Sequence, residues 1–445
     1  MSHVTRAPRR SGGLPWIGHT PEYVRDPQAF MARQHERYGP VSEARMLGDD
    51  WTMLIGPDAC EQAFRNADKA FASGPGWGRL VGPFFHRGLM LLDFEEHHRH
   101  RRALQGAFTR AHVAAYTDAL QDPVATTIAQ WPAGSTQRVY DLLKTLTLGV
   151  ATEVFMGESD ADPDELAEVN RAFVDCVQAA TTLVRVPLPG TRWRRAQDGR
   201  RRLEEFFGSR LAARRERPGD DLFSVLATLT DDDGALVLSD ADVVNHMIFL
   251  LMAAHDTSTI TVSTMVQLLG QHPEWQERCR AEAMTLGERP SLEDLEGLVD
   301  LDLVMREALR IVPPVPVVAR ETVKDTEVLG VPIPAGRFVA VMLHHTHHMP
   351  EIWTDPDRFD PERFSPERRE DARHRHAWDP FGGGVHKCLG LVFARHEVLT
   401  IVAHLLRTRT WRVDPAYVAP LSYVSLPFPT DGLPVTMHRL QPAPA

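Results

Sequence analysis

The feature that most restricts the fold of this chain is a long, almost wholly apolar helical stretch that follows Ser239. Ser239 and Asp242 have the spacing of a capping box, and Asp240 adds negative charge to the first turn. The apolar pattern runs to Gly270, and Pro273 stands just past its end. About 32 residues at 1.5 Å rise per residue would span roughly 48 Å, the width of a whole domain. We therefore predict a buried central helix.

The rest of the chain is predicted to be mainly helical with small β-sheets, which is an α+β fold class. The strand signals are a hairpin at 41–56 around Gly48, and segments near 317–330 and 337–343. Residues 1–20 are rich in Arg, Gly and Pro and indicate an irregular lead-in. A chain of 445 residues would suggest about three domains at roughly 150 residues each.

Composition excludes several classes of protein. The net charge of -11 argues against a nucleic-acid binder, because phosphate recognition needs a basic face. The four cysteines are scattered and form no CxxC pair, which argues against a zinc ribbon and fits a reducing compartment. The polar opening segment has no signal-peptide core, and the longest apolar run, 247–254, is far shorter than a membrane span. We expect a soluble, cytoplasmic protein without a membrane anchor.

The most informative segment is FGGGVHKCLG at 381–390. Its three glycines permit positive φ and a tight loop whose backbone can pass close to a flat group. Cys388 directly precedes a helical pattern, so free N–H groups and a helix dipole would stabilise its thiolate. Such a site suits a metal-bound sulfur, although a lone cysteine is more often a buried structural residue. The spacing does not match a phosphate-binding loop, and Lys387 is not followed by Ser or Thr.

This segment and four others resemble the motifs of the cytochrome P450 family. The haem-ligand signature FxxGx[RH]xCxG is matched from Phe381 to Gly390. In the expected order, the chain also has DFEEHHRHRR at 93–102, AAHDTS at 253–258, an ExxR pair within MREALR, and PERF at 361–364. The resemblance covers nearly the whole chain. It implies a cytochrome P450 fold with haem between two central helices, and hence one domain over 21–445.

The resemblance implies that Cys388 is the axial ligand of heme b. A thiolate pushes electron density onto iron and favours O–O cleavage. Basic residues at 97, 101, 320 and 386 would grip the haem propionates, which need cations or strong donors. The implied cofactor-binding set is His97, Arg101, Arg320, Phe381, Gly382, His386, Cys388 and Gly390. The neighbouring His98 and His100 match no motif and are expected to face solvent.

The resemblance gives Asp256 and Thr257 a catalytic role. Thr257 would hydrogen-bond iron-bound dioxygen and Asp256 would relay protons to it. The alternative is an Asp in a buried salt bridge beside a Thr that only fills the helix. The family commonly has Gly at the position of Ala254, so the resemblance does not determine the shape of the helix beside the oxygen site.

Two further sets follow from the resemblance. A structural triad of Glu307, Arg310 and Arg363 would hold the loop before the cysteine. The substrate pocket would be apolar, although several of its members are also plausible core residues. This predicted pocket comprises Trp77, Phe84, Phe85, Leu92, Ala253, Val315, Val317, Val318, Leu426 and Phe428.

The histidine cluster LHHTHH at 343–348 invites a zinc-site interpretation, which we do not favour. There is no HExxH motif, and adjacent histidines on a strand would point to opposite faces.

The substrate is expected to be lipophilic. The segment at 188–207 resembles the retinoid- and steroid-hydroxylating branches of the family, which favours a sterol, terpenoid or long-chain lipid. The chain carries no ferredoxin-type cysteine spacing and no flavin domain, so electrons should come from a separate ferredoxin and ferredoxin reductase. Arg99, Arg102, Lys387 and Arg395 could form a basic docking patch for that partner.

The leading hypothesis is thus an O2-dependent haem-thiolate monooxygenase. One alternative is a peroxide-driven peroxygenase, and another is a non-catalytic haem-binding sensor. Both are disfavoured because the acid–alcohol pair Asp256 and Thr257 is present.

Overall fold

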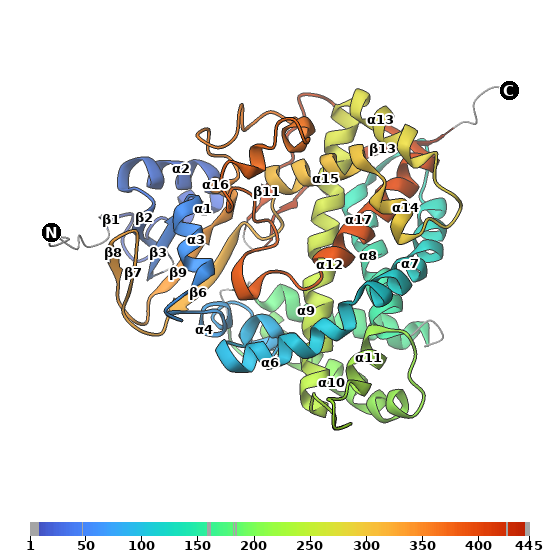
Figure 1. Cartoon of the computed structure of the whole chain (residues 1–445), viewed down its shortest axis with the longest axis horizontal. Coiled ribbons are helices and arrows are strands. Elements are labelled where there is room, and N and C mark those ends of the chain that lie inside the picture. Colours follow the sequence, from blue (N-terminus) through green and yellow to red (C-terminus); the bar gives the residue numbers. More distant parts are fainter. Residues whose placement is uncertain are drawn as a thin grey trace.

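The computed structural model describes residues 9–46, 48–157, 162–180, 182, 185–423 and 426–440. It is mainly α-helical with small sheets, as predicted (Figure 1). The α-helices are α1 Thr20–Arg25, α2 Pro27–Tyr38, α3 Pro57–Arg65, α4 Ser73–Gly78, α5 Gly82–Phe85, α6 Phe94–Gln105, α7 Arg110–Gln130, α8 Val139–Met156, α9 Pro163–Ala180, α10 Arg192–Glu216, α11 Leu222–Thr228, α12 Asp240–Gln271, α13 Pro273–Ala283, α14 Leu292–Glu296, α15 Val299–Ile311, α16 Leu343–Thr346 and α17 Leu391–Thr408.

The strands are short. They are β1 Arg9–Ser11, β2 Val41–Met46, β3 Asp49–Ile55, β4 Phe71–Ala72, β5 Thr136–Arg138, β6 Val317–Thr322, β7 Thr326–Val328, β8 Val331–Ile333, β9 Phe338–Met342, β10 Arg409–Arg412, β11 Leu421–Ser422, β12 Phe428–Pro429 and β13 Pro434–Arg439.

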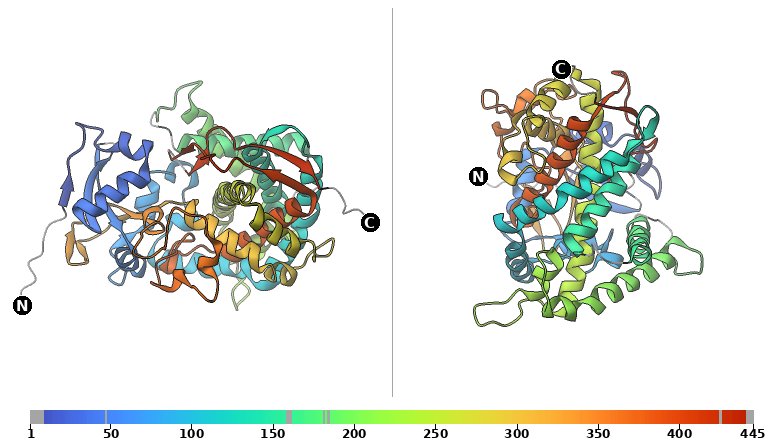
Figure 2. Two further views of the ribbon diagram at one scale, coloured as in Figure 1. Left: turned by 90° about the horizontal axis from the view of Figure 1, so that it is seen from above. Right: turned by 90° about the vertical axis from the view of Figure 1, so that its right-hand side faces the viewer.

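The predicted central helix is confirmed as α12, with 32 residues. Ser239 is its N-cap, and the Ser239 hydroxyl accepts a hydrogen bond from the Asp242 N–H. Most of its side chains are buried on every side. Figure 1 shows α12 running the length of the helical part, and in the left view of Figure 2 this helix is seen nearly end-on, with other elements around it.

The largest sheet has the strand order β1-β2-β3-β9-β6-β4. The predicted hairpin is confirmed as the antiparallel pair β2 and β3, and the predicted strands near 317–330 and 337–343 as β6, β7 and β9. Strand β9 is buried on both faces, with Val339 and Val341 in one small core and Phe338 and Ala340 in another. A much larger core surrounds α12 and joins the helices.

The lead-in is less irregular than predicted. Residues Arg9–Ser11 form β1, which pairs in parallel with β2, and Thr20 opens α1. Gly18 pairs with Met46 of β2 and lies against Arg45, where a Cβ would meet the Arg45 carbonyl oxygen at 1.9 Å. Backbone pairing of this kind has no side-chain periodicity, so it could not be predicted from the local pattern. Residues 1–8 lie outside the described part of the chain.

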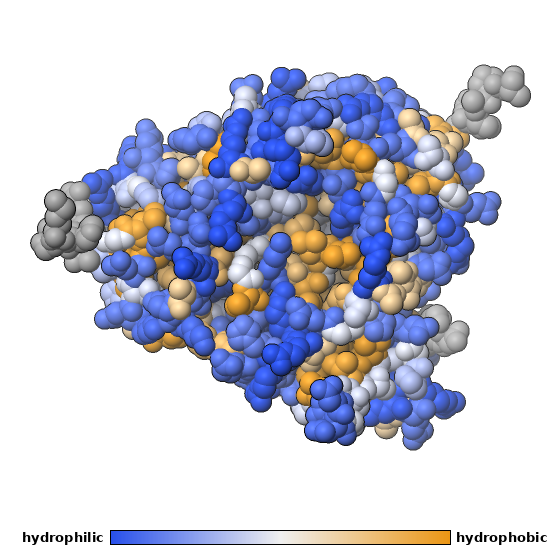
Figure 3. Space-filling model, viewed as in Figure 1, coloured by the Kyte–Doolittle hydropathy of each residue, from blue (hydrophilic) through white to orange (hydrophobic). Residues whose placement is uncertain are grey.

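The surface seen in Figure 3 is mainly hydrophilic, with hydrophobic residues gathered near its centre. Within the described residues, no helix is both long and apolar enough to cross a membrane.

Candidate active site

The cysteine loop follows the predicted geometry. Gly382 and Gly384 have φ of 67° and 64°, which glycine adopts readily. A Cβ on Gly384 would lie 2.0 Å from the Phe64 carbonyl oxygen of α3, so the glycine also allows close packing of the loop on that helix. The Cys388 N–H donates to the Phe381 carbonyl oxygen at 2.9 Å, and α17 starts three residues after Cys388.

Cys388 differs from the other three cysteines. Cys60, Cys176 and Cys279 are buried, whereas Cys388 is exposed. Desolvation by neighbouring protein atoms raises the pKa of the Cys388 thiol. The Gly390 N–H and the positive charges of Arg101 and Lys387 counteract this effect. These are the helix-terminal donor and the cations that stabilise a thiolate.

Basic side chains from three elements gather beside this loop. The rings of His97 (α6) and His386 have centroids 3.9 Å apart. Desolvation, together with the charges of Arg101 and Arg320, lowers the pKa of His97 to about 4. Desolvation is also the main cause that lowers the pKa of His386 to about 2, with Arg320 next. The structure thus brings together His97, Arg101, Arg320 and His386, as predicted.

Two of these basic groups, His97 and Arg320, have few partners of their own, whereas the His386 Nε2 lies 3.7 Å from the Asp93 Oδ1. Both ring nitrogens of His97 are buried without a hydrogen-bond partner. Arg320, from β6, is buried and donates only to the Ala319 carbonyl oxygen at 2.8 Å and the Ser73 hydroxyl at 3.4 Å among described residues. Burial lowers the Arg320 pKa to about 10, against the opposing charge of Asp93. Arg320 is thus a buried cation without a hydrogen-bonded carboxylate among the described residues, which is costly unless an anionic group completes the site, and a haem propionate fits this need.

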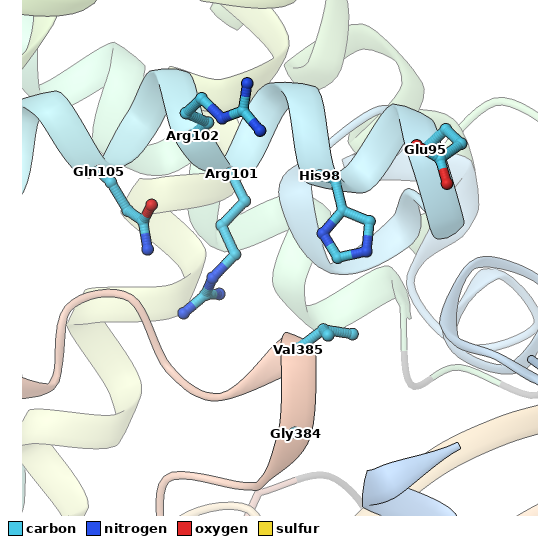
Figure 4. A pocket seen from close by; sticks show the side chains of 7 residues that line it. All are labelled: Glu95, His98, Arg101, Arg102, Gln105, Gly384 and Val385. Carbon is cyan, nitrogen blue, oxygen red and sulfur yellow. The ribbon is translucent and has the colours of Figure 1, made fainter. Parts of the chain in front are cut away.

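A pocket of about 420 Å³ opens between α6 and this loop. In Figure 4 the side chains of His98 and Arg101 extend from α6 toward the cysteine loop, which carries Val385. The pocket is also lined by Glu95, Arg102, Gln105 and Gly384.

In the middle of α12, Ala253 is exposed and Ala254 and Thr257 are half-buried, although most residues of this helix are buried. The Thr257 hydroxyl donates to the Ala253 carbonyl oxygen at 2.8 Å. The helix continues unbroken through Ala254, so the alanine leaves its α-helical shape intact. This exposed strip lies beside the predicted catalytic pair.

Asp256 is held by two basic residues. Its Oδ1 lies 3.2 Å from the Lys144 Nζ of α8 and 3.1 Å from the His255 Nδ1. Burial acts to raise the Asp256 pKa, but His255 and Lys144 outweigh it, and the pKa is lowered. The salt bridge considered as the alternative therefore exists. It favours the ionised form of Asp256 beside Thr257.

The predicted triad is assembled and fully buried. The Arg310 Nε and Nη2 donate to Glu307 Oε2 and Oε1 at 2.7 and 2.9 Å. The Arg363 Nε, in the 3-10 turn η3 Pro361–Phe364, donates to Glu307 Oε1 at 3.0 Å. Arg310 also donates to the His347 carbonyl oxygen, and the His347 ring accepts the Asp379 N–H at 3.0 Å. Through His347 the triad reaches the segment just before the cysteine loop.

The predicted pocket residues divide into two groups. Ala253 is exposed, and Trp77, Val315, Val317, Leu426 and Phe428 are half-buried. By contrast, Phe84 and Phe85 are buried in the main core, where their rings lie 4.8 Å from Trp193 and 6.4 Å from Phe173. Leu92 and Val318 are also buried. These four are packed in the protein interior.

Two expectations about histidines are wrong. His100 is buried instead of facing solvent, and its Nδ1 lies 2.8 Å from the Nε2 of His246 on α12. In the basic docking patch, Arg99, Arg102 and Lys387 are exposed, but Arg395 is paired with Asp302 at 2.6 Å. The histidines of 343–348 begin on the short helix α16 instead of a strand, because β9 ends at Met342. Among the described residues, no group of three or more metal-ligating side chains occurs.

Sequence reasoning missed Glu397 and its partner. Glu397 of α17 is buried, and the Ser258 hydroxyl of α12 donates to its Oε2. Desolvation raises the Glu397 pKa to about 7, and the Ser258 hydrogen bond only partly opposes it. A carboxylate within the apolar run HEVLTIVAHLL was the signal that could have revealed it.

Comparison with known proteins agrees with this geometry. The family model for cytochrome P450 matches residues 8–430. A putative cytochrome P450 136 from Mycobacterium tuberculosis is 44% identical over 435 residues, which is 96% of this chain and 87% of that protein. Cyclooctat-9-en-7-ol 5-monooxygenase from Streptomyces melanosporofaciens is 31% identical, covering 91% of this chain and 89% of that protein.

A solved structure supports the same assignment. A retinoic acid-bound cyanobacterial protein, CYP120A1, superposes with a TM-score of 0.86 at 30% identity, covering 98% of this chain and 100% of that one. The chain therefore belongs to the cytochrome P450 family and is a haem-dependent oxidoreductase with the cytochrome P450 fold.

Proposed function

We propose that this protein is an O2-dependent monooxygenase in which Cys388 is the axial ligand of haem. The observation that carries the proposal is the placement of two buried basic residues with few partners, His97 and Arg320, beside an exposed cysteine that directly precedes α17. His97, Arg101, Arg320 and His386 would hold the propionates. When bound, haem supplies the oxygen-activating chemistry of this family.

In this proposal, the chain's own residues manage protons and water around that group. Thr257 presents a hydroxyl on the exposed strip of α12, and Asp256 stands next to it as a carboxylate held by Lys144 and His255. The half-exposed Lys144 gives this carboxylate a route to solvent. Asp256 would take up a proton from that side and pass it toward Thr257. Glu307, Arg310 and Arg363 would hold the cysteine loop in place.

The role of Asp256 and Thr257 is tested by measuring how tightly reductant consumption is coupled to product formation. Asp256→Asn and Thr257→Ala should each consume reductant without matching product, with more peroxide released. Ser263→Ala is the matched control, because Ser263 also donates to the carbonyl oxygen one turn back but lies on another face of α12. Full coupling in both variants would sink the proposed role.

We propose a lipophilic substrate of the sterol, terpenoid or long-chain lipid type. The half-buried residues predicted for the pocket are apolar, namely Trp77, Val315, Val317, Leu426 and Phe428. Two similar proteins carry retinoic acid or cyclooctat-9-en-7-ol in their names, and both compounds are largely hydrocarbon. The test is a screen of steroids, terpenoids and fatty acids for a low-to-high-spin shift. If only polar compounds shifted the spectrum, the proposed substrate class would be wrong.

We further propose that electrons come from a separate ferredoxin and ferredoxin reductase. The exposed Arg99, Arg102 and Lys387 form a basic surface on the cysteine side of the molecule, which suits an acidic partner.

A further inference from the structure

Trp378 lies three residues before Phe381 and packs against Arg306 and Phe364, which are sequence neighbours of the triad residues Glu307 and Arg363. Its indole N–H donates to the Arg306 carbonyl oxygen at 3.2 Å. The Arg306 guanidinium lies 5.1 Å from the Trp378 ring centre and 4.6 Å from that of Phe364. The rings of Trp378 and Phe364 meet edge to face at 5.6 Å. The proposed function gives Trp378 no role.

The two residues that contact Trp378 are held in place by their position next to the buried triad. Arg306 directly precedes Glu307 on α15, and Phe364 directly follows Arg363 in η3. The Arg306 guanidinium is fixed by Asp371 at 2.8 Å. In Figure 1 the orange segment between β9 and α17 lies beside α15, which agrees with this packing. The ionic network therefore determines where the Trp378 ring sits.

On its other side, Trp378 reaches the cysteine loop. Its ring meets the Phe381 ring edge to face, at 6.3 Å and 74°. The Phe381 carbonyl oxygen accepts the Cys388 N–H at 2.9 Å. Phe381 is half-buried, so packing against Trp378 is one of the contacts that keep water from this end of the loop.

We propose that Trp378 is a positioning residue that transmits the triad's rigidity to Phe381 and thereby limits water at the Cys388 sulfur. This inference rests on the proposed ligation of haem by Cys388. Ferric iron with the porphyrin dianion and one thiolate has no net charge, whereas the ferrous unit carries one negative charge. Because a wetter site stabilises the charged form more, loosening Phe381 should favour the ferrous state.

The test is spectroelectrochemical reduction of the haem-loaded protein. At the potential that half-reduces the wild type, the ratio of ferrous to ferric protein should be several-fold higher in Trp378→Leu. Hydrogen exchange of the Cys388 amide should also be faster in this variant. Trp353→Leu is the matched control, because Trp353 packs on Phe364 at 5.5 Å from its ring centre but belongs to a different segment, 28 residues before Phe381 in sequence. It should lose stability without moving the potential.

Trp378→Phe keeps one aromatic ring but loses the indole N–H and the second ring, so it covers the case in which the leucine variant does not fold. It should shift the potential in the same direction by less. An unchanged potential in Trp378→Phe together with unchanged amide exchange would overturn the inference, as would equal potential shifts in the Trp378 and Trp353 variants. Failure of the proposed ligation is distinguishable, because it would appear in the wild type as a reduced carbon-monoxide spectrum without thiolate character.

Discussion

The buried carboxyl group of Glu397 should make the stability of the protein depend on pH. It is buried on α17 with one hydrogen bond from Ser258, and its pKa is raised from 4.5 to about 7. A carboxyl whose pKa is higher in the folded than in the unfolded state stabilises the fold below the unfolded pKa. That stability is lost as pH rises through the folded pKa. The rise of the pKa from 4.5 to about 7 corresponds to about 3 kcal/mol of stability in all.

The substitution Glu397→Gln keeps an oxygen acceptor for Ser258 and removes the ionisable group. Between pH 5 and pH 8 the wild type should therefore lose about 2 to 3 kcal/mol of stability relative to this variant. The assay is urea unfolding of the haem-loaded proteins at constant ionic strength, across that pH range. Glu36→Gln, an exposed position on α2, serves as the control and should show no such trend. A pH-independent difference between wild type and Glu397→Gln would refute the reasoning.

Two further outcomes follow from the site. Arg363→Lys keeps the positive charge but loses the planar guanidinium. That group donates to Glu307, Glu370 and the carbonyl oxygens of Thr354 and Arg358, so the substitution should lower the free energy of unfolding by about 3 to 5 kcal/mol. The haem content of the purified variant measures it, and a normal content would contradict the structural role of the triad. Arg102→Glu should slow ferredoxin-dependent reduction and weaken its salt dependence, since Arg102 is exposed beside the loop. Reduction by dithionite should not change, and an unaltered ferredoxin rate would remove Arg102 from the docking surface.

The central helix, the hairpin and the cysteine loop could be predicted because each follows from local chemistry. The α12 apolar run, the Ser239 cap and the glycines of the loop carry their signals in adjacent residues. The triad was predicted from its resemblance to the family, and the structure confirms its contacts with every atom buried.

The remainder depends on tertiary contacts that no local pattern encodes. The pairing of His100 with His246 joins α6 to α12 across 146 residues, and the pairing of Lys144 with Asp256 joins α8 to α12. Likewise, whether Phe84 lines a pocket or packs on Trp193 depends on where α10 lies, and this is not visible in the sequence of α5. Arg395 looked free because its partner, Asp302, comes from another helix.

The measurement that most directly tests the central claim is the absorption spectrum of the reduced carbon-monoxide complex of the purified protein. With Cys388 as the thiolate ligand, the wild type should show the strongly red-shifted Soret band of haem-thiolate proteins, and Cys388→His should lose it. A globin-like band in the wild type would contradict ligation by Cys388.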